Sequence, residues 1–302
     1  EQRARVGVLN DGPGAARGGG GLDGLDGHAR SPRVQVGLGE LDEFPFLDPP
    51  APRAIADGYG LLQELNAVSG NRELTDIGRE LARLPLDPRI GRMLVAARGE
   101  RCLAQVRIIA AALSVQDPRS RPADKAAAAD ERHAQFADER SDFLAYLKLW
   151  KLFDGKWEKT CRENFLSVPR MREWRDVETQ LERTLEELEW PASSSTEYRN
   201  IHRALCTGLL GNIGMREEAE GAYLGARGIK FWIHPGSGVK KPGRWVMAGE
   251  LVETTRLFAR SVAALDPKWL EELGGHLFKR ERHDPFWDPR RGQVLALERA
   301  TL

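Results

Sequence analysis

The hydrophobic pattern of this chain changes its period after Gly211. Before this glycine, apolar residues recur every three to four positions, which is the spacing of one face of an α-helix. After it they alternate, and the alternation predicts strands at about 222–226, 229–234, 244–252 and 254–263. The change of period therefore predicts a mainly α-helical protein with a small β-barrel toward its C-terminal end.

The first helical segment, residues 44–100, has the element order of a winged helix. An extended lead is followed by a helix, a short strand at Glu73–Thr75, and a helix capped by Thr75. Asp87 and Pro88 are a cap and a first-turn residue for the next helix. Helix, strand, helix and helix within this length predict a winged-helix domain.

Residues 101–192 are predicted to be helical throughout. The longest helix is expected from Pro169 to Trp190, with an apolar seam in which either Val177 or Glu178 faces inward. Residues 191–195 read as a linker whose Ser195 caps the following helix. A further helix is expected to start at Asp266 and to include Leu277.

Residues 1–43 differ from the rest of the chain. Eleven of the 31 glycines lie in residues 1–40, and apolar periodicity is almost absent there. Such a composition buries little apolar surface, so this segment is predicted to be disordered or poorly packed.

Composition excludes several classes of protein. No apolar run approaches the roughly 20 residues of a membrane span, and no secretory signal is recognisable, so a cytoplasmic protein without membrane contact is expected. The cysteines Cys102, Cys161 and Cys206 lie far apart in apolar helical patterns, which favours reduced core thiols over disulfides. No histidine or cysteine spacing predicts a metal site.

The common catalytic motifs are also absent from the sequence. It contains no GxxxxGK[ST] loop, no GxGxxG after a strand, no HExxH and no GxSxG. Hydrolysis of a nucleoside triphosphate needs a backbone cradle for the phosphates, so no catalytic residue and no cofactor are assigned to this chain.

Positive charge is concentrated in the strand-forming block. Residues 221–260 hold seven Lys or Arg against Glu250 and Glu253, although the formal net charge of the chain is zero. A basic patch of this kind on a small barrel of the oligonucleotide-binding (OB) type is typical of proteins that bind a polyanion such as a nucleic acid.

Aromatic residues alternate with these cations, and bases can stack on exposed aromatic rings. The candidates are Tyr223, Phe231, Trp232 and Trp245, of which Phe231 and Trp245 are favoured for the core. His234 either contacts phosphate or completes a turn. The arginines between positions 170 and 183 are favoured as a solvated helix face, and base reading by the winged helix is disfavoured.

The order and the amino-acid sequences of these segments resemble the C-terminal half of a DEAH-box RNA helicase of the bacterial HrpA type. The resemblance spans about residues 37–302 and is carried by FPFLDPP, LTDIGRELARLPLDPRIGRML, SVQDPRSRPADK, ERSDFLAYLKLW, EYRNIHRALCTGLLGNIG, GARGIKFWIHPGSGVKKP and RWVMAGELVETTRLFAR. Many independent stretches agree in order, which is more specific than any single motif.

The resemblance implies a winged helix at 44–100, a helical ratchet (HA2) domain at 101–192, an OB-fold with a connecting helix at 193–265 and the start of a C-terminal extension at 266–302. In such helicases these domains close over two RecA-like motor domains and hold single-stranded RNA during ATP-driven movement from 3′ to 5′. The partners implied are single-stranded RNA and the motor domains of the same, monomeric protein, which use ATP and Mg²⁺. The residues carried over as RNA contacts are Lys230, His234, Ser237, Lys240, Lys241, Arg256 and Arg260, with Arg170 and Arg172 as weaker candidates.

The chain departs from the family at its N-terminal end. It has neither the phosphate loop nor the DEAH box, and EQRARVGVLND only faintly matches the QRxGRxGR motif. We therefore expect a truncated or frame-disturbed fragment in which residues 1–43 are a remnant of the second motor domain and which does not hydrolyse ATP alone. The alternatives are a motor-free RNA-binding or scaffolding protein and a winged-helix transcription regulator.

Overall fold

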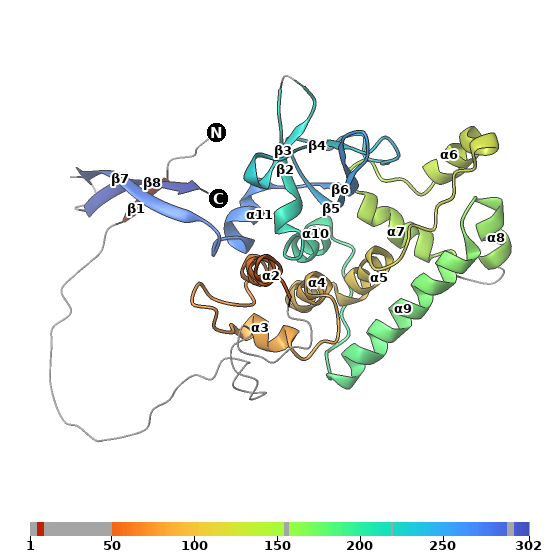
Figure 1. Cartoon of the computed structure of the whole chain (residues 1–302), viewed down its shortest axis with the longest axis horizontal. Helices are drawn as coiled ribbons and strands as arrows, with labels where there is room; N and C mark the ends of the chain where they lie inside the picture. Colours follow the sequence, from red (N-terminus) through yellow and green to blue (C-terminus); the bar gives the residue numbers. More distant parts are fainter. Residues whose placement is uncertain (1–4, 9–49, 154–156, 219, 289–292, 302) are drawn as a thin grey trace. The chain divides into compact units, whose positions relative to one another are not determined.

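The computed structural model describes residues 5–8, 50–153, 157–218, 220–288 and 293–301. The chain divides into two compact units, one formed by Asp48–Leu273 and the other by Glu1–Leu47 together with Gly274–Leu302. The larger unit contains the helices and the β-barrel (Figure 1).

The winged-helix segment contains three helices, α2 (Pro52–Glu64), α3 (Asp76–Leu81) and α4 (Pro88–Gly99). The two predicted caps are confirmed, because Thr75 accepts a hydrogen bond from the Gly78 amide and Asp87 accepts from the amides of Arg89 and Ile90. The strand predicted at Glu73–Thr75 is present only as a single bridge between Leu74 and Val68. The pairing stays short because Asn66, with φ of 55°, bends the facing segment out of an extended conformation.

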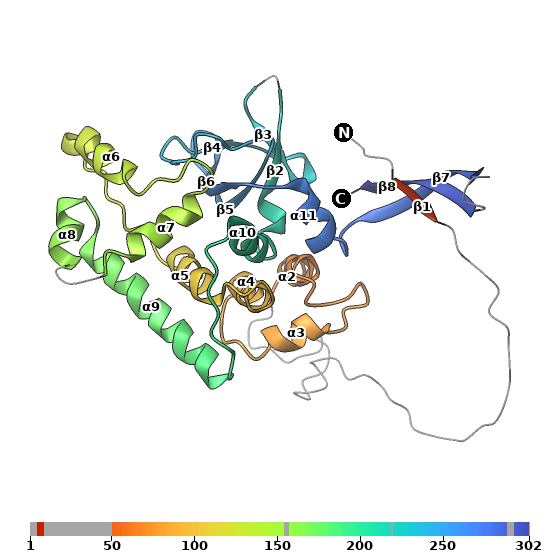
Figure 2. The same cartoon turned by 180° about the vertical axis from the view of Figure 1, so that it is seen from behind.

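The helical domain packs a long helix against a shorter buried one (Figures 1 and 2). Its elements are α5 (Leu103–Leu113), the short η2 (Ala123–Lys125), α6 (Ala126–Ala134), α7 (Asp142–Trp150), α8 (Trp157–Glu163) and α9 (Val168–Glu187). On the inward seam of α9, Glu178 is buried whereas Val177 is half-buried. Glu178 takes the inward position because Arg107 of α5 pairs with it at 2.7 Å.

Several predicted helix ends are wrong. Helix α9 ends at Glu187 instead of Trp190, and Glu189 has a φ of 56° that no helix continues through. Ser195 does not cap α10 (Tyr198–Cys206), because its hydroxyl accepts from the amide of Glu197, which is itself the N-cap residue. Helix α11 (Pro267–Leu273) stops before Leu277.

The predicted five-stranded barrel is confirmed. Its strands are β2 (Ile213–Arg216), β3 (Tyr223–Gly225), β4 (Lys230–Ile233), β5 (Trp245–Glu253) and β6 (Leu257–Ala264), with the short η3 (Leu210–Asn212) before β2 and η4 (Ala226–Gly228) between β3 and β4. They close in the order β2-β3-β4-β6-β5, and only β4 and β6 pair in parallel. Strand β2 lies outside the four ranges that alternation predicts.

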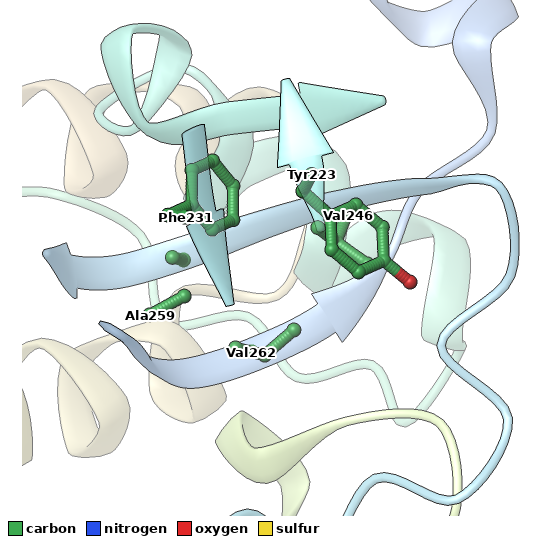
Figure 3. Packing of buried hydrophobic residues seen from close by; sticks show 6 residues of the cluster. Tyr223, Phe231, Val246, Ala259 and Val262 are labelled. Carbon is green, nitrogen blue, oxygen red and sulfur yellow. The ribbon is translucent and has the colours of Figure 1, made fainter. Parts of the chain in front are cut away.

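The barrel interior is a compact apolar cluster (Figure 3). Its buried members are Tyr223, Phe231, Val246, Ala248, Ala259 and Val262. Phe231 is fully buried, as predicted, but Trp245 is only half-buried because it stands at the first position of β5. Gly214 of β2 makes the cluster possible, since a Cβ at this position would overlap the Phe231 ring.

The smaller unit contains a three-stranded sheet. Strand β8 (Gln293–Thr301) pairs with β7 (Lys279–Asp288) on one edge and with β1 (Arg5–Val8) on the other. Of the glycine-rich segment 1–43, only this strand belongs to the described residues, so the prediction of disorder concerns residues outside them.

Cys102, Cys161 and Cys206 are free and buried, as predicted for core side chains. Burial raises the pKa of Cys161 to about 11 and those of Cys102 and Cys206 to about 12. None of the helices described is long and apolar enough to cross a bilayer. The described residues also contain no group of acidic, histidine or cysteine side chains that could hold a metal ion.

Candidate nucleic-acid interface

The outer face of the barrel is set by the alternation of β4. Phe231 lies in the core and Ile233 packs against it, so Lys230, Trp232 and His234 are directed to the opposite side. Strand β6 continues this face, because Trp232 is in register with Phe258 in the parallel pair. One side of β4 and β6 therefore presents aromatic and basic side chains together.

Arg256 joins this face from the turn between β5 and β6. Its guanidinium carbon lies 5.0 Å from the centroid of the Trp232 ring. The turn is closed by hydrogen bonds from the Thr254 amide and hydroxyl to the Arg256 carbonyl. The loop between the fourth and fifth strands of an OB barrel is one of its usual ligand-binding loops, and Arg256 lies in that loop.

His234 ends the same face beside Phe258, with the ring centroids 5.7 Å apart in an edge-to-face arrangement. Partial burial, followed by the positive charge of Arg260, lowers the pKa of His234 below its usual value. The imidazole is therefore neutral at neutral pH and offers one donor and one acceptor, but no cation.

Two predicted RNA contacts are held in exposed ion pairs. Lys230 lies 2.8 Å from Glu217 and 3.5 Å from Glu220, and Arg260 lies 3.6 Å from Glu250. The hydrogen bond with Glu217 raises the pKa of Lys230. Exposed pairs of this kind contribute about 0–1 kcal/mol, so they reduce the positive potential of the face without fixing the side chains.

The loop after β4 is anchored to the helical domain by one carboxylate. Asp142 in the first turn of α7 accepts from the Ser237 hydroxyl at 2.7 Å and from the Gly238 amide at 2.8 Å. Its Oδ2 also accepts from the buried amide of Val262 in β6 at 2.9 Å. The Ser237 hydroxyl thus donates within the protein, and Asp142 fixes the loop relative to β6.

The two lysines of this loop differ in their surroundings. The backbone amides of Lys240 and Lys241 both donate to the Glu139 carbonyl at 3.0 Å. The Lys241 ammonium also pairs with the Glu139 carboxylate at 2.8 Å, whereas Lys240 forms no ion pair among the described residues. The exposed ammonium of Lys240 is therefore available for an anion.

Arg170 and Arg172 bind partners within the helical domain. Arg170 donates to the Asp117 carbonyl at 3.0 Å, and Arg172 lies 2.6 Å from the Glu158 carboxylate. The structure thus gathers Trp232, His234, Phe258, Arg256 and Arg260 on one face, and it places these two arginines on α9.

Three family models match consecutive parts of the chain. The helicase associated domain (HA2), winged-helix, matches residues 60–86, and the helicase associated domain (HA2), ratchet-like, matches residues 87–146. The oligonucleotide/oligosaccharide-binding (OB)-fold matches residues 201–277.

Similar proteins are RNA helicases. The chain is 45% identical over 282 residues to the ATP-dependent RNA helicase HrpA of Escherichia coli (strain K12) and 44% identical over 284 residues to the HrpA homolog of Haemophilus influenzae, in each case over 88% of this chain and 22% of the relative. The pre-mRNA-splicing factor ATP-dependent RNA helicase prp22 of Schizosaccharomyces pombe is 33% identical over 253 residues, which is 81% of this chain and 21% of that protein. The chain spans about a fifth of the length of these relatives, in their C-terminal region.

This chain contains the HA2 winged-helix, HA2 ratchet-like and OB-fold domains, and over 88% of its length it is similar to the C-terminal region of HrpA-type RNA helicases. The resemblance found in the sequence is confirmed, including the order of winged helix, ratchet and OB-fold. By the matched ranges, Asp142 belongs to the ratchet-like domain. The Ser237, Gly238 and Val262 groups that donate hydrogen bonds to it belong to the OB-fold.

The contact between the ratchet-like domain and the OB-fold includes residues that sequence reasoning missed. Tyr198 of α10 stacks on His202 with ring centroids 3.6 Å apart, and the guanidinium carbon of Arg140 lies 4.0 Å from the centroid of the Tyr198 ring. The Tyr198 hydroxyl donates to the Ala264 carbonyl of β6 at 2.7 Å, and His202 shares a 2.6 Å hydrogen bond with Ser141. The only sequence signal was the cap-like Ser141 before Asp142, which predicts a helix start and no contact with a distant strand.

Proposed function

We propose that this chain is the RNA-gripping accessory region of a cytoplasmic ATP-dependent RNA helicase that moves from 3′ to 5′. It would couple single-stranded RNA to RecA-like motor domains whose motifs this sequence does not contain. The observation that carries the proposal is the outer face of β4 and β6, where aromatic rings and arginines lie together on an OB-fold. Its relatives are RNA helicases by name, which supports RNA as the polyanion.

The chemistry of this face suits a strand held without sequence preference. Cationic side chains such as Arg256 and Lys240 attract phosphates at any sequence, and aromatic rings accept any base. Because Asp142 fixes the 234–241 loop to both the ratchet-like domain and β6, a load on the RNA would pass directly into the helices.

ATP and Mg²⁺ do not fit the described residues. The sequence has no glycine-rich phosphate loop, and the described side chains form no cluster that could hold a divalent cation. We assign nucleotide binding and hydrolysis to the motor domains and derive no chemical step from this chain.

The test is a binding titration of the purified chain with labelled oligouridine, random-sequence RNA and duplex DNA. We expect similar affinities for the two single strands, weaker binding to the duplex and no ATP hydrolysis. Hydrolysis at a helicase-like rate would contradict the assignment of the motor, and a preferred duplex sequence would favour a transcription regulator. Light scattering of the same sample tests the proposal that the protein is monomeric.

A further inference from the structure

We propose that Trp232 is a stacking platform for one unpaired nucleobase and that Arg256 covers this platform when no RNA is bound. The proposal rests on the proposed function and adds a base-binding position to a surface whose cations suit phosphates. Its ligand is the flat face of any base in a single-stranded polynucleotide.

The position of Trp232 in the strand argues for a role outside the core. Its neighbours Phe231 and Ile233 both face the apolar cluster, so the indole points away from that cluster and is half-buried on the outer side. Phe258 lies beside it in register, and the residues that flank Phe258 in β6, Leu257 and Ala259, both contribute to the core. The barrel therefore holds two aromatic side chains on its outer face that its interior does not need.

The other aromatic candidates are less suited to stacking. Tyr223 and Phe231 are 2% and 0% exposed and pack on one another inside the barrel. Trp245 is half-buried at the start of β5, and its backbone carbonyl accepts from the Leu265 amide. Among these four aromatic candidates, and within the described residues, Trp232 alone has a cation over its ring.

Arg256 is held over the indole by a weak contact. Its guanidinium forms no ion pair among the described residues, and a cation–π contact at a partly exposed site is weaker than base–aromatic stacking. A base can therefore replace the guanidinium on the ring face. The released side chain stays beside the strand, where a phosphate of the same nucleotide can pair with it.

The experiment compares two probes of equal length and charge, an oligouridine and an oligomer of abasic ribose phosphate. The variants are Trp232→Leu, which removes the ring, and Trp232→Phe, which keeps a smaller one. Trp287→Leu is the control, because Trp287 is 61% exposed and lies in the other compact unit. Thermal unfolding of each variant shows that it is folded before binding is measured.

We expect Trp232→Leu to weaken oligouridine binding by about 5- to 100-fold, which corresponds to one lost stacking interaction. Binding of the abasic oligomer should not change, Trp232→Phe should recover part of the affinity, and Trp287→Leu should match the unchanged protein. If Trp232→Leu does not fold, quenching of tryptophan fluorescence by oligouridine is compared between the unchanged protein and Trp232→Phe. Loss of that quenching in Trp232→Phe supports the platform, and its persistence overturns it.

Two outcomes separate this proposal from the function on which it rests. If Trp232→Leu leaves oligouridine affinity unchanged, or weakens both probes equally, there is no base platform although RNA binding remains. If the unchanged protein binds neither probe, the proposed function itself fails.

Discussion

Asp142 holds the 234–241 loop, the start of α7 and strand β6 together through three hydrogen bonds. Asp142→Asn replaces one carboxylate oxygen by an amide NH2 group. This group donates hydrogen bonds, so it cannot accept one from the donor that faces it. Hydrogen bonds to a charged group contribute about 1.5–3 kcal/mol each, so we expect the free energy of unfolding to fall by about 3 kcal/mol. Hydrogen exchange should show faster exchange at the amides of Gly238 and Val262.

The matched control is Asp138→Asn, four residues earlier. Asp138 pairs with Lys148 at a longer distance of 3.7 Å, so its loss should cost less than about 1 kcal/mol. Equal exchange rates at Gly238 in both variants would show that Asp142 does not anchor the loop.

His202 links stability to pH. Burial lowers its pKa from 6.5 to about 4, so the unfolded chain takes up a proton at a higher pH than the folded protein does. The neutral imidazole therefore makes its full contribution to the free energy of unfolding above about pH 6.5. About 3 kcal/mol of this free energy is lost as the pH falls toward 4. Urea unfolding between pH 7 and 4 should show this loss, and His202→Gln should remove that part of the pH dependence. An identical pH profile in both proteins would contradict the buried, neutral imidazole.

At the scale of elements, the contact between α5 and α9 contains a buried ion pair. Burial raises the pKa of Glu178, and the charge of Arg107 opposes this shift. Arg107→Leu leaves the carboxylate without its partner, so we expect a loss of about 3–5 kcal/mol in urea unfolding. The double variant Arg107→Leu with Glu178→Leu should recover most of that loss.

Glu182 provides the comparison, because it pairs with the same guanidinium but is 43% exposed. Glu182→Ala should cost less than about 1 kcal/mol. If the double variant is no more stable than Arg107→Leu alone, the unpaired carboxylate carries no energetic penalty and the pair does not explain why a glutamate lies in the seam.

Alternation and caps allowed four of the five barrel strands and the starts of α3 and α4 to be predicted from the sequence. Strand β2 was not predicted because it has only four residues and one of them is a glycine, which weakens any strand pattern. The same Gly214 is required by the packing of Phe231 from another strand, and no local pattern shows that. Ser195 was misread because a serine before a helix can bond a nearby amide without being the cap.

The candidate site was predictable in composition but not in geometry. Counting charges located the cations of residues 221–260 and their aromatic neighbours, but it could not show that Lys230, Lys241 and Arg260 have acidic partners. Three of their four partners, Glu217, Glu220 and Glu139, come from outside that block, and Asp142 lies about a hundred residues from the amides that it binds. Such contacts depend on the tertiary fold.

At the scale of the whole molecule, the formal net charge is zero, so any affinity for a polyanion must come from a local surface. The account predicts that this surface is the OB-fold face with its adjoining loop. The helical domain also carries exposed Lys and Arg residues. Replacing three of them gives a control variant with the same change of net charge on a different surface.

The most direct test is the salt dependence of oligouridine binding. Each phosphate neutralised on a single strand contributes about 0.7 to the slope of log affinity against log salt concentration. Removing Lys240, Lys241 and Arg256 together by alanine substitution should reduce affinity and lower the slope by about 2, whereas alanine at Lys151, Lys159 and Arg162 should change neither. An unchanged slope in the first variant, or an equal fall in both, would contradict the claim that the OB-fold face holds the RNA.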